Sequence, residues 1–327
     1  RFCKTMLIIE DGRQAGYGST MEVFENPCTI AAAKLTGCKN IEKIEPIATG
    51  KSNDKKYLLV LKNGTLLLER VGPISRYDRF KMMYDELIDL KGLNEPGIPI
   101  PYFVTKEDDT AVLLTSYSKG IPLNEIITDK NCSLDRVKEL GRKTGNLLAS
   151  VHTLSPLAPT DSGDFDVLFK NILSDYVNLS LYLKHEQDMI SFVLNHMKEV
   201  MTARPITYIH GNFDERILLV SPTDRIFFVD TRDISSFDPF YDFKNIGVIT
   251  RFENIEFAKS IIDSYTEGHP TDEFWLAFEL YNAFKLMSTT IELIKEGKEK
   301  EAIDKFETVA DDFHGFKEDE IGKPKWY

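Results

Sequence analysis

The stretch from Ile206 to Phe243 constrains the fold most, because it places short apolar runs directly before polar and acidic side chains. The runs at 206–209, 217–220 and 226–229 are bounded by Pro, Gly and charged residues, a pattern that predicts short buried strands. Ser-Pro-Thr-Asp joins the second run to the third, which predicts a hairpin. A carboxylate at the end of a buried strand needs a cation nearby, since an unpaired buried charge is unfavourable. Asp230 follows the third run and is therefore a candidate metal ligand.

The same stretch resembles the catalytic segment of the aminoglycoside phosphotransferase and choline kinase family, whose pattern is H-G-D-x-x-x-x-N followed by a strand pair and I-D. In the related protein kinases the first Asp accepts the proton of the substrate hydroxyl, and the Asn and the second Asp hold Mg²⁺. When the chain is aligned on His210 and Gly211, Asn212 replaces the Asp and Ile217 replaces the Asn. An amide cannot accept a proton and an isoleucine cannot bind a hard cation. The resemblance therefore supports the fold more strongly than the activity.

The resemblance implies roles for particular residues of this segment. His210, Asn212 and Asp214 would form the catalytic loop, with Asp214 the substitute if the loop takes another path. Asp230 would be the Mg²⁺ ligand, and the D-P-x-x-D motif that ends in Asp242 follows it as in the family.

Composition limits the alternatives. The chain has 327 residues, of which 42% are hydrophobic and 28% charged, so it can bury two moderate cores. A formal net charge of -12 argues against a nucleic-acid partner, because affinity for phosphate backbones comes from Lys and Arg. The four cysteines show no C-x-x-C spacing, which predicts reduced thiols and a cytoplasmic setting. No apolar run approaches the roughly 20 residues of a membrane span.

The first forty residues differ from the remainder. Residues 6–40 resemble the C-terminal tail of an ABC-importer ATPase, with a strand, a glycine-containing turn and two helices. No G-x-x-x-x-G-K-[ST] motif occurs in the sequence, so the phosphate-binding loop of such an ATPase is absent. The glycine pair in Gly16–Ser19 does not have the spacing of a phosphate loop, and we interpret it as a turn. Residues 1–43 are predicted to be a separate N-terminal segment, either a functional part of the protein or an artefact of fusion or of the gene start.

From residue 44 the pattern predicts a small β lobe. Strands are expected at 57–61 and 65–71, joined by the hairpin signal Asn63-Gly64. An amphipathic helix is expected at 76–93, and a further strand at 110–117. By resemblance, the nucleotide-binding residues of this lobe lie in a glycine turn, a strand, a helix and the link to the next lobe: Gly50, Ser52, Asn53, Arg70, Glu86, Ser116 and Tyr117. Arg70 and Glu86 are expected to form an ion pair, as the strand cation and the helix glutamate do in kinases.

The rest of the chain is predicted to be mostly helical. Ser133 is expected to cap a helix at 134–154, residues 161–166 are expected to form a loop, and three helices are expected after residue 252. Four large side chains of these late helices are read mainly as core, with an acceptor pocket as the alternative: Trp275, Tyr281, Phe284 and Met287.

Together these features predict a two-lobed protein-kinase-like α+β fold. It comprises an antiparallel β lobe with one helix at 44–117, a larger helical lobe at 118–327 and the short extra N-terminal segment. Two functions remain open at this point. One is an ATP- or GTP-dependent, Mg²⁺-dependent phosphotransferase acting on a hydroxyl of a small molecule of the aminoglycoside, amino alcohol or sugar type. The other is a catalytically impaired nucleotide-binding or interaction protein of the same fold. The acceptor, the nucleotide base and the oligomeric state do not follow from the sequence.

Overall fold

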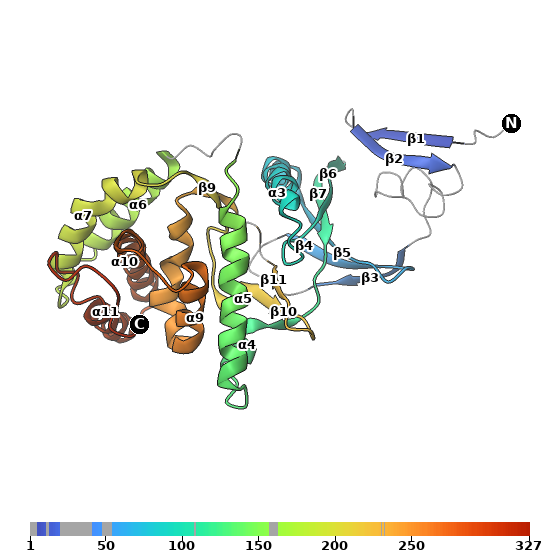
Figure 1. Cartoon of the computed structure of the whole chain (residues 1–327). Coiled ribbons are helices and arrows are strands. Elements are labelled where there is room, and N and C mark those ends of the chain that lie inside the picture. The colour runs from blue at the N-terminus through green and yellow to red at the C-terminus, as the bar shows by residue number, and fades with distance from the viewer. Residues whose placement is uncertain are drawn as a thin grey trace. The chain divides into compact units, whose positions relative to one another are not determined.

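The computed structural model describes residues 5–10, 13–19, 41–47, 54–107, 109–156, 163–229, 231 and 233–327. The chain divides into two compact units, Arg1–Lys119 and Gly120–Tyr327 (Figure 1). The first unit is built mainly on antiparallel strands and the second mainly on helices. The predicted mixed α+β class is therefore confirmed.

A five-stranded antiparallel sheet, in the order β3-β4-β5-β7-β6, forms the centre of the first unit. Its strands are β3 (Ile41–Pro46), β4 (Lys55–Leu61), β5 (Leu66–Pro73), β6 (Pro101–Glu107) and β7 (Thr110–Ser116). The predicted hairpin between β4 and β5 is confirmed, with Gly64 at a φ of +82°. The Asn63 side-chain oxygen accepts a hydrogen bond from the Thr65 N–H at 3.0 Å and closes the turn.

Helix α3 (Tyr77–Leu90) covers one face of this sheet, beside β6 and β7 (Figure 1). It continues from a 3₁₀ turn at Ile74–Arg76 and ends in another at Lys91–Leu93. Phe80 and Met83 of the helix pack against buried side chains of β7. A second cluster, formed by Leu59, Leu67, Phe103 and Leu114, fills the opposite face. The sheet is thus apolar on both faces, which explains its continuous hydrophobic runs.

Two further strands, β1 (Thr5–Glu10) and β2 (Arg13–Ser19), pair in an antiparallel hairpin. The predicted turn at Gly16–Ser19 is wrong, because these residues lie within β2 and pair with β1. Glycine tolerates extended backbone as readily as turns, so its presence alone did not decide between them. The two helices expected before residue 40 fall outside the described residues.

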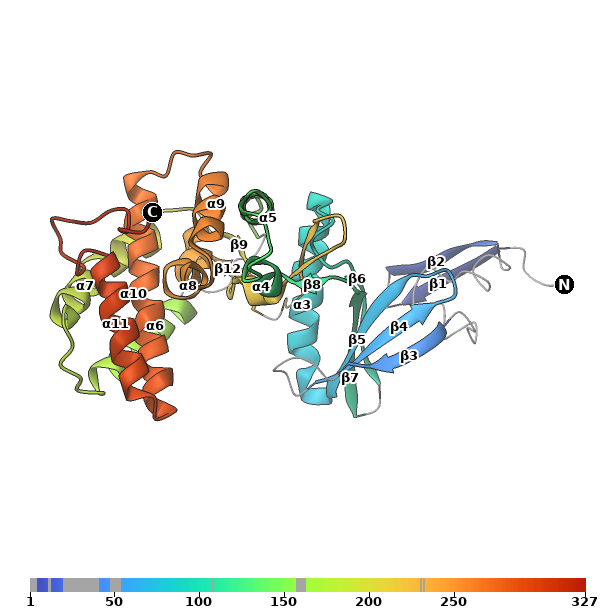
Figure 2. The same ribbon diagram turned by 90° about the horizontal axis from the view of Figure 1, so that it is seen from below.

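Helices dominate the second unit, and Figure 2 shows α10 and α11 side by side. Their bounds are α4 (Leu123–Ile127), α5 (Leu134–His152), α6 (Gly163–Val177), α7 (Glu186–Thr202), α8 (Arg251–Glu253), α9 (Ile255–Tyr265), α10 (Asp272–Lys295) and α11 (Glu299–Asp312). Ser133 caps α5 as expected, accepting a hydrogen bond from the Arg136 N–H at 3.3 Å. The helices of the described ranges include none long and apolar enough to cross a membrane.

The expected loop at 161–166 is partly wrong, because α6 begins at Gly163. The Phe165 ring stacks on Phe237 with 3.9 Å between their centroids, so helix formation here buries an aromatic face. That contact joins segments about seventy residues apart, so a local sequence pattern cannot predict it.

The stretch from Ile206 to Phe243 contains four short strands in the described residues. Strand β9 (Thr207–Ile209) pairs with β12 (Ser235–Phe237), while β10 (Leu218–Val220) pairs with both β11 (Ile226–Phe228) and β8 (Ile121–Pro122). The predicted hairpin between β10 and β11 is confirmed, with Leu219 opposite Phe227. Strand β12 was not predicted. It is followed by a 3₁₀ helix, η4 (Pro239–Asn245), and a π-helix, η5 (Ile246–Thr250).

Candidate active site

The loop that follows β9 is held in a conformation that only glycine permits at residue 211. Gly211 has a φ of +79°, and a Cβ atom built there would lie 2.1 Å from the carbonyl oxygen of Asp233. The backbone after β9 therefore passes directly against the backbone that precedes β12. His210, beside it, is 1% exposed, and its ring lies 4.9 Å from that of Phe228. The structure thus places His210 in the core behind the loop.

The Asp242 carboxylate binds the backbone of this loop. It accepts hydrogen bonds from the backbone N–H of His210 at 2.6 Å and of Gly211 at 2.7 Å. His152 Nε2 lies 3.1 Å from the same carboxylate, and Tyr265 Oη lies 2.7 Å from His152 Nδ1. Burial alone would raise the pKa of Asp242, but the hydrogen bond and charge of His152 hold it below its usual value. Asp242 is therefore a buried, ionised anchor for the loop.

Lys244 binds the other backbone group of Gly211, its carbonyl. Its ammonium group donates a hydrogen bond to the Gly211 carbonyl and lies 3.7 Å from the centre of the Tyr241 ring. Burial lowers the pKa of Lys244 to about 8, although the Asp242 carboxylate opposes this shift. Both backbone groups of Gly211 are thus fixed by side chains of η4. Sequence reasoning missed Lys244, because one lysine in an aromatic segment carries no local signal.

The predicted catalytic residues of the loop have different surroundings. Asn212 is half-buried, and its side chain makes no hydrogen bond to any residue that the structure describes. Asp214 is 2% exposed and accepts hydrogen bonds from the Arg216 N–H at 2.8 Å and from Arg216 Nε at 3.1 Å. Asp214 therefore caps the short helix η3 (Glu215–Ile217) and is paired with a cation. Ile217 is half-buried, so it is not a core residue.

The predicted metal site cannot be built from the described residues. Asp230 lies outside them, as do Gly50, Ser52 and Asn53. Within the described ranges, no three His, Cys, Asp or Glu side chains gather closely enough to hold a metal ion. The ligand role of Asp230 remains a prediction.

Arg70 of β5 and Glu86 of α3 do not form the expected ion pair. Arg70 is 5% exposed and stands opposite Leu113 in the sheet, on the face that α3 covers. The charges that act on the Glu86 carboxylate are those of Arg79, Asp85 and Asp89, and one of its oxygens is buried without a hydrogen bond. Burial raises the pKa of Glu86 to about 8. The predicted pair of Arg70 with Glu86 is wrong for this structure, because burial favours a neutral glutamic acid over a paired carboxylate.

Two residues predicted to meet the nucleotide base are engaged in the sheet. The Ser116 hydroxyl accepts a hydrogen bond from the Ile100 N–H at 2.8 Å, and the Ser116 N–H donates to the Ile100 carbonyl. The Tyr117 N–H donates to the Leu66 carbonyl at 3.0 Å. The N–H groups of Ser116 and Tyr117 therefore already donate to backbone carbonyls. Any binding of the nucleotide base by this segment would use other groups.

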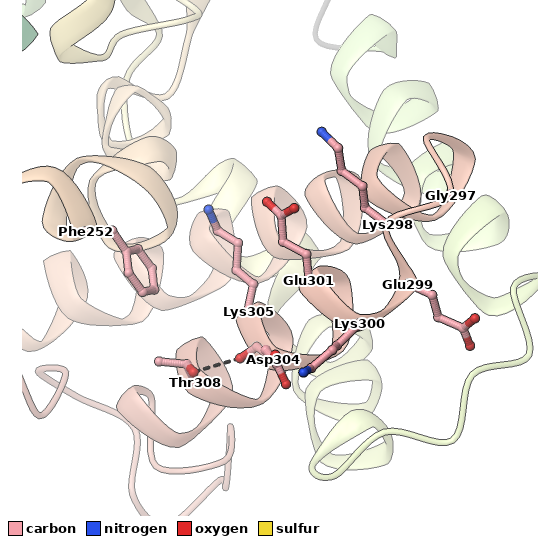
Figure 3. Close-up of a pocket in the computed structure, with 9 residues that line it drawn as sticks. All are labelled: Phe252, Gly297, Lys298, Glu299, Lys300, Glu301, Asp304, Lys305 and Thr308. Atoms are coloured by element: carbon pink, nitrogen blue, oxygen red, sulfur yellow. Dashed lines mark hydrogen bonds between the residues drawn. The ribbon is translucent and has the colours of Figure 1, made fainter.

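A surface pocket of about 710 Å³ lies on the second unit, beside the start of α11. Figure 3 shows Lys305 and Glu301 of α11 together on the side of the pocket where Phe252 lies. The four large side chains considered for an acceptor pocket do not line it. All four belong to α10 and are at most 6% exposed, so they are core residues, as the sequence predicted: Trp275, Tyr281, Phe284 and Met287.

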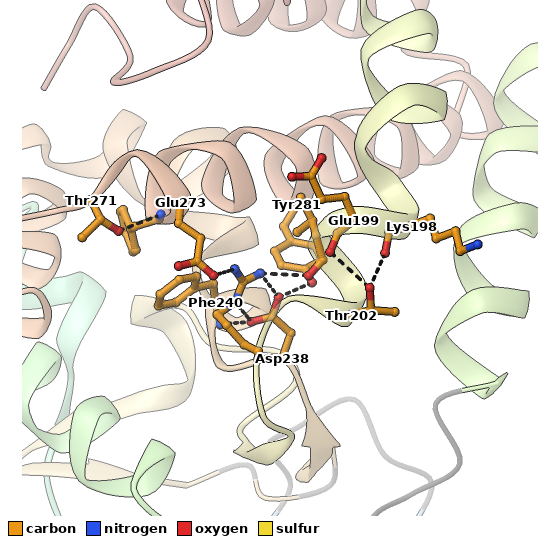
Figure 4. A network of polar contacts seen from close by, with 11 residues as sticks. Lys198, Glu199, Thr202, Asp238, Phe240, Thr271, Glu273 and Tyr281 are labelled. Atoms are coloured by element: carbon orange, nitrogen blue, oxygen red, sulfur yellow. Dashed lines mark hydrogen bonds and ion pairs between the residues drawn. The ribbon is translucent and has the colours of Figure 1, made fainter.

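A polar network fixes the segment that carries Asp242 and Lys244 (Figure 4). Asp238 caps η4 by accepting a hydrogen bond from the Phe240 N–H at 3.0 Å. It also accepts hydrogen bonds from Arg204 Nε at 2.8 Å and from Tyr281 Oη at 2.6 Å. Arg204 extends the network to Glu273 at 2.8 Å and stacks over the Phe240 ring. The first and last Asp of the D-P-x-x-D motif thus have separate roles: Asp238 anchors η4, and Asp242 anchors the loop that follows β9.

Residues 43–275 match a family described as the phosphotransferase enzyme family, APH. The chain belongs to this family. No curated protein matches the chain. The family match begins one residue before the predicted small lobe and includes the whole segment from β9 to η5, so the anchored loop lies within the matched region.

Solved structures share the fold of this APH-family chain. An aminoglycoside phosphotransferase from Alicyclobacillus acidocaldarius is 11% identical, with a TM-score of 0.59 over 85% of this chain and 91% of that one. The choline kinase LicA from Streptococcus pneumoniae is 15% identical, with a TM-score of 0.52 over 85% and 98%. The amicoumacin kinase hAmiN, in complex with AMP-PNP, Ca²⁺ and Ami, is 10% identical, with a TM-score of 0.57 over 89% and 95%. The predicted kinase-like fold is confirmed.

Proposed function

We propose that this APH-family chain transfers the terminal phosphoryl group of ATP or GTP to a hydroxyl group of a small molecule. The observation that carries the proposal is the anchored loop. Asp242 and Lys244 bind both backbone groups of Gly211, so the position of Asn212 is set by the fold. A loop without a function would have little need for a buried carboxylate and a buried ammonium group on one glycine.

In the proposed reaction the acceptor oxygen forms a bond to the terminal phosphorus, and the bond from that phosphorus to its bridging oxygen breaks. The hydroxyl proton leaves to water, because the Asn212 amide cannot accept it. Asn212 would orient the acceptor hydroxyl, so rate enhancement would come from positioning and charge neutralisation. Bound Mg²⁺ would supply further charge neutralisation, with Asp230 as its proposed ligand. A cytoplasmic location remains part of the proposal.

A thermal-shift titration with ATP and GTP, with and without Mg²⁺, tests the binding step. A nucleotide at about a hundredfold its dissociation constant stabilises the folded state by about 2.7 kcal/mol. We expect a shift that requires Mg²⁺ and is lost in Asp230→Asn. The absence of a shift with either nucleotide would overturn the proposal.

The double substitution Asn212→Asp with Ile217→Asn tests the transfer step. It would return a base and an oxygen ligand to the positions that the family uses, so we expect faster phosphoryl transfer than in the wild type. Because Ile217 is half-buried, an amide there should keep access to water and leave the melting temperature nearly unchanged. The measurement is product formation on a panel of hydroxylated acceptors, with melting temperature as the control. A folded, nucleotide-binding double variant that transfers less than the wild type would contradict the assigned loop positions.

A further inference from the structure

The outermost strand of the five-stranded sheet, β3, has one edge to which no strand of the described ranges is bonded (Figure 2). Its other edge pairs with β4, and just beyond β3 the Ile47 N–H donates a hydrogen bond to the Lys56 carbonyl at 2.8 Å. Because backbone groups alternate in direction along a strand, the N–H and C=O of Ile44 point away from β4. Backbone groups that face outward in this way can bond to a further extended strand.

Ile44 also presents an apolar side chain at this edge. Its side chain is 57% exposed, and it stands opposite Leu59 of β4, which is 2% exposed. Leu59 belongs to the apolar cluster that it forms with Leu67, Phe103 and Leu114. Residues directly opposite each other place their side chains on the same face of a sheet, so Ile44 extends this apolar face to the edge. An apolar side chain left in water there gains free energy when a partner covers it.

The residues on either side of Ile44 carry opposite charges. Lys43 and Glu45 form an ion pair within the strand, and their side chains are 64% and 41% exposed. A second β3, antiparallel to the first with a two-fold axis at Ile44, places Lys43 of each copy opposite Glu45 of the other. An axis at Lys43 would instead oppose two lysines, and an axis at Glu45 would oppose two glutamates, which is unfavourable. The charges of β3 are therefore complementary to those of a second copy in one register.

The two ends of β3 limit the length of such a pairing. Pro46 has no N–H to donate, and the pairing of β3 with β4 shifts between Ile41 and Lys43. Both features interrupt a ladder of hydrogen bonds, so only a short ladder centred on Ile44 can form. Because a two-fold arrangement uses the same edge of both copies, two chains complete the contact and no open edge of β3 remains.

We propose that β3 is a homodimer interface, in which two copies of the chain join their five-stranded sheets through antiparallel β3 strands with the two-fold axis at Ile44. The interface lies wholly in the first unit and does not depend on the proposed phosphoryl transfer. It brings the two Ile44 side chains together on the face that Leu59 occupies, and it surrounds them with alternating lysines and glutamates.

Sedimentation velocity of the full chain, from about 5 µM to about 1 mM, tests the dimer. We expect a reversible equilibrium between monomer and dimer with a dissociation constant between about 1 µM and 1 mM, because so short an interface is a weak one. A chain that stays monomeric over the whole range would overturn the proposal, and so would one that forms open-ended assemblies instead of dimers.

Substitutions in β3 locate the contact. Ile44→Lys puts two like charges at the axis, and Lys43→Glu puts glutamates opposite each other, so each should raise the dissociation constant by about tenfold or more. Lys43→Glu combined with Glu45→Lys exchanges the charges and should restore the dimer, because opposite charges face each other again. Lys91→Glu makes the same charge change at an exposed lysine after α3 and should leave the dimer unchanged.

The melting temperature of each variant at low concentration is the control for folding. These side chains are exposed, so we expect values close to that of the wild type. A dimer that resists Ile44→Lys uses another surface, and the assignment is then wrong. The register is wrong if the charge exchange leaves the dimer as weak as Lys43→Glu alone does. If Lys91→Glu weakens the dimer as much as Lys43→Glu, the effect is one of net charge and the proposal fails.

Discussion

At the scale of single residues, the site depends on buried charges that are compensated to different degrees. Asp242 is fully buried yet stays ionised, because it receives two backbone N–H groups and lies against His152. Glu86 has no such donors: one of its oxygens is buried without a hydrogen bond, and its pKa rises to about 8. The donors and the charge around Asp242 therefore outweigh the effect of burial on its pKa, whereas burial prevails at Glu86.

Glu86 should make the stability of the chain depend on pH. Its pKa rises from 4.5 to about 8 on folding, so the folded state retains a proton that the unfolded state releases. Stability should therefore decrease as pH rises from about 4.5 to about 8. Glu86→Gln should flatten this dependence and raise stability at pH 8, on the order of 1–3 kcal/mol at about 1.4 kcal/mol per pKa unit. Denaturant unfolding at several pH values measures this.

The neighbouring Asp85 provides the control. Its side chain is 51% exposed and pairs with Lys81, so Asp85→Asn should leave the pH profile nearly unchanged. An unchanged profile in Glu86→Gln would mean that Glu86 is ionised in the folded chain.

At the scale of elements, the second unit depends on how closely α5 approaches α9. Gly141 and Gly145 of α5 both face α9. A Cβ atom at Gly141 would lie 2.6 Å from the Ser260 Cβ, and one at Gly145 would lie 2.5 Å from the Ile261 carbonyl oxygen. This close packing aligns α5 so that His152, its last residue, reaches both Asp242 and Tyr265. The position of the loop after β9 thus depends on the contact between α5 and α9, through His152 and Asp242.

Gly145→Ala should test this contact. Alanine favours the helix, but its methyl group would meet the backbone of α9 and push the two helices apart. We expect a net destabilisation of about 1–3 kcal/mol, measured by denaturant unfolding.

Gly92→Ala is the matched control, because a Cβ atom there has nothing within 4 Å. It should be neutral or slightly stabilising. If Gly145→Ala is as well tolerated as Gly92→Ala, α5 and α9 are less tightly packed than described.

At the scale of the whole molecule, the second unit contains its own apolar core. Its aromatic side chains stack across α6, η4, α10 and α11, as in the contacts of Phe169 with Phe284 and of Tyr176 with Phe306. The two residues that anchor the loop after β9, Asp242 and Lys244, also belong to this unit. The second unit therefore contains both the loop and the groups that hold it.

A fragment of residues 120–327 should accordingly fold alone. We expect a cooperative denaturant transition and a near-UV circular dichroism signal from its packed aromatic residues. Strong binding of a hydrophobic dye, with no near-UV signal, would instead indicate that the first unit is needed to complete the core.

The sequence by itself determined the class of fold, the order of most elements and the family, because these follow from apolar periodicity, turn residues and short ordered motifs. The Asn63-Gly64 hairpin, the Ser133 cap and the strands around the catalytic loop are all local patterns. Such patterns need only neighbouring residues, so they can be recognised before the fold is known.

Only the tertiary structure decided which side chains meet. It joined His152 to Asp242 and Lys244 to Gly211, placed α6 where a loop was expected, and left Arg70 and Glu86 unpaired with each other. These contacts link residues far apart in the chain, and their strength depends on burial and on distances that no local pattern encodes.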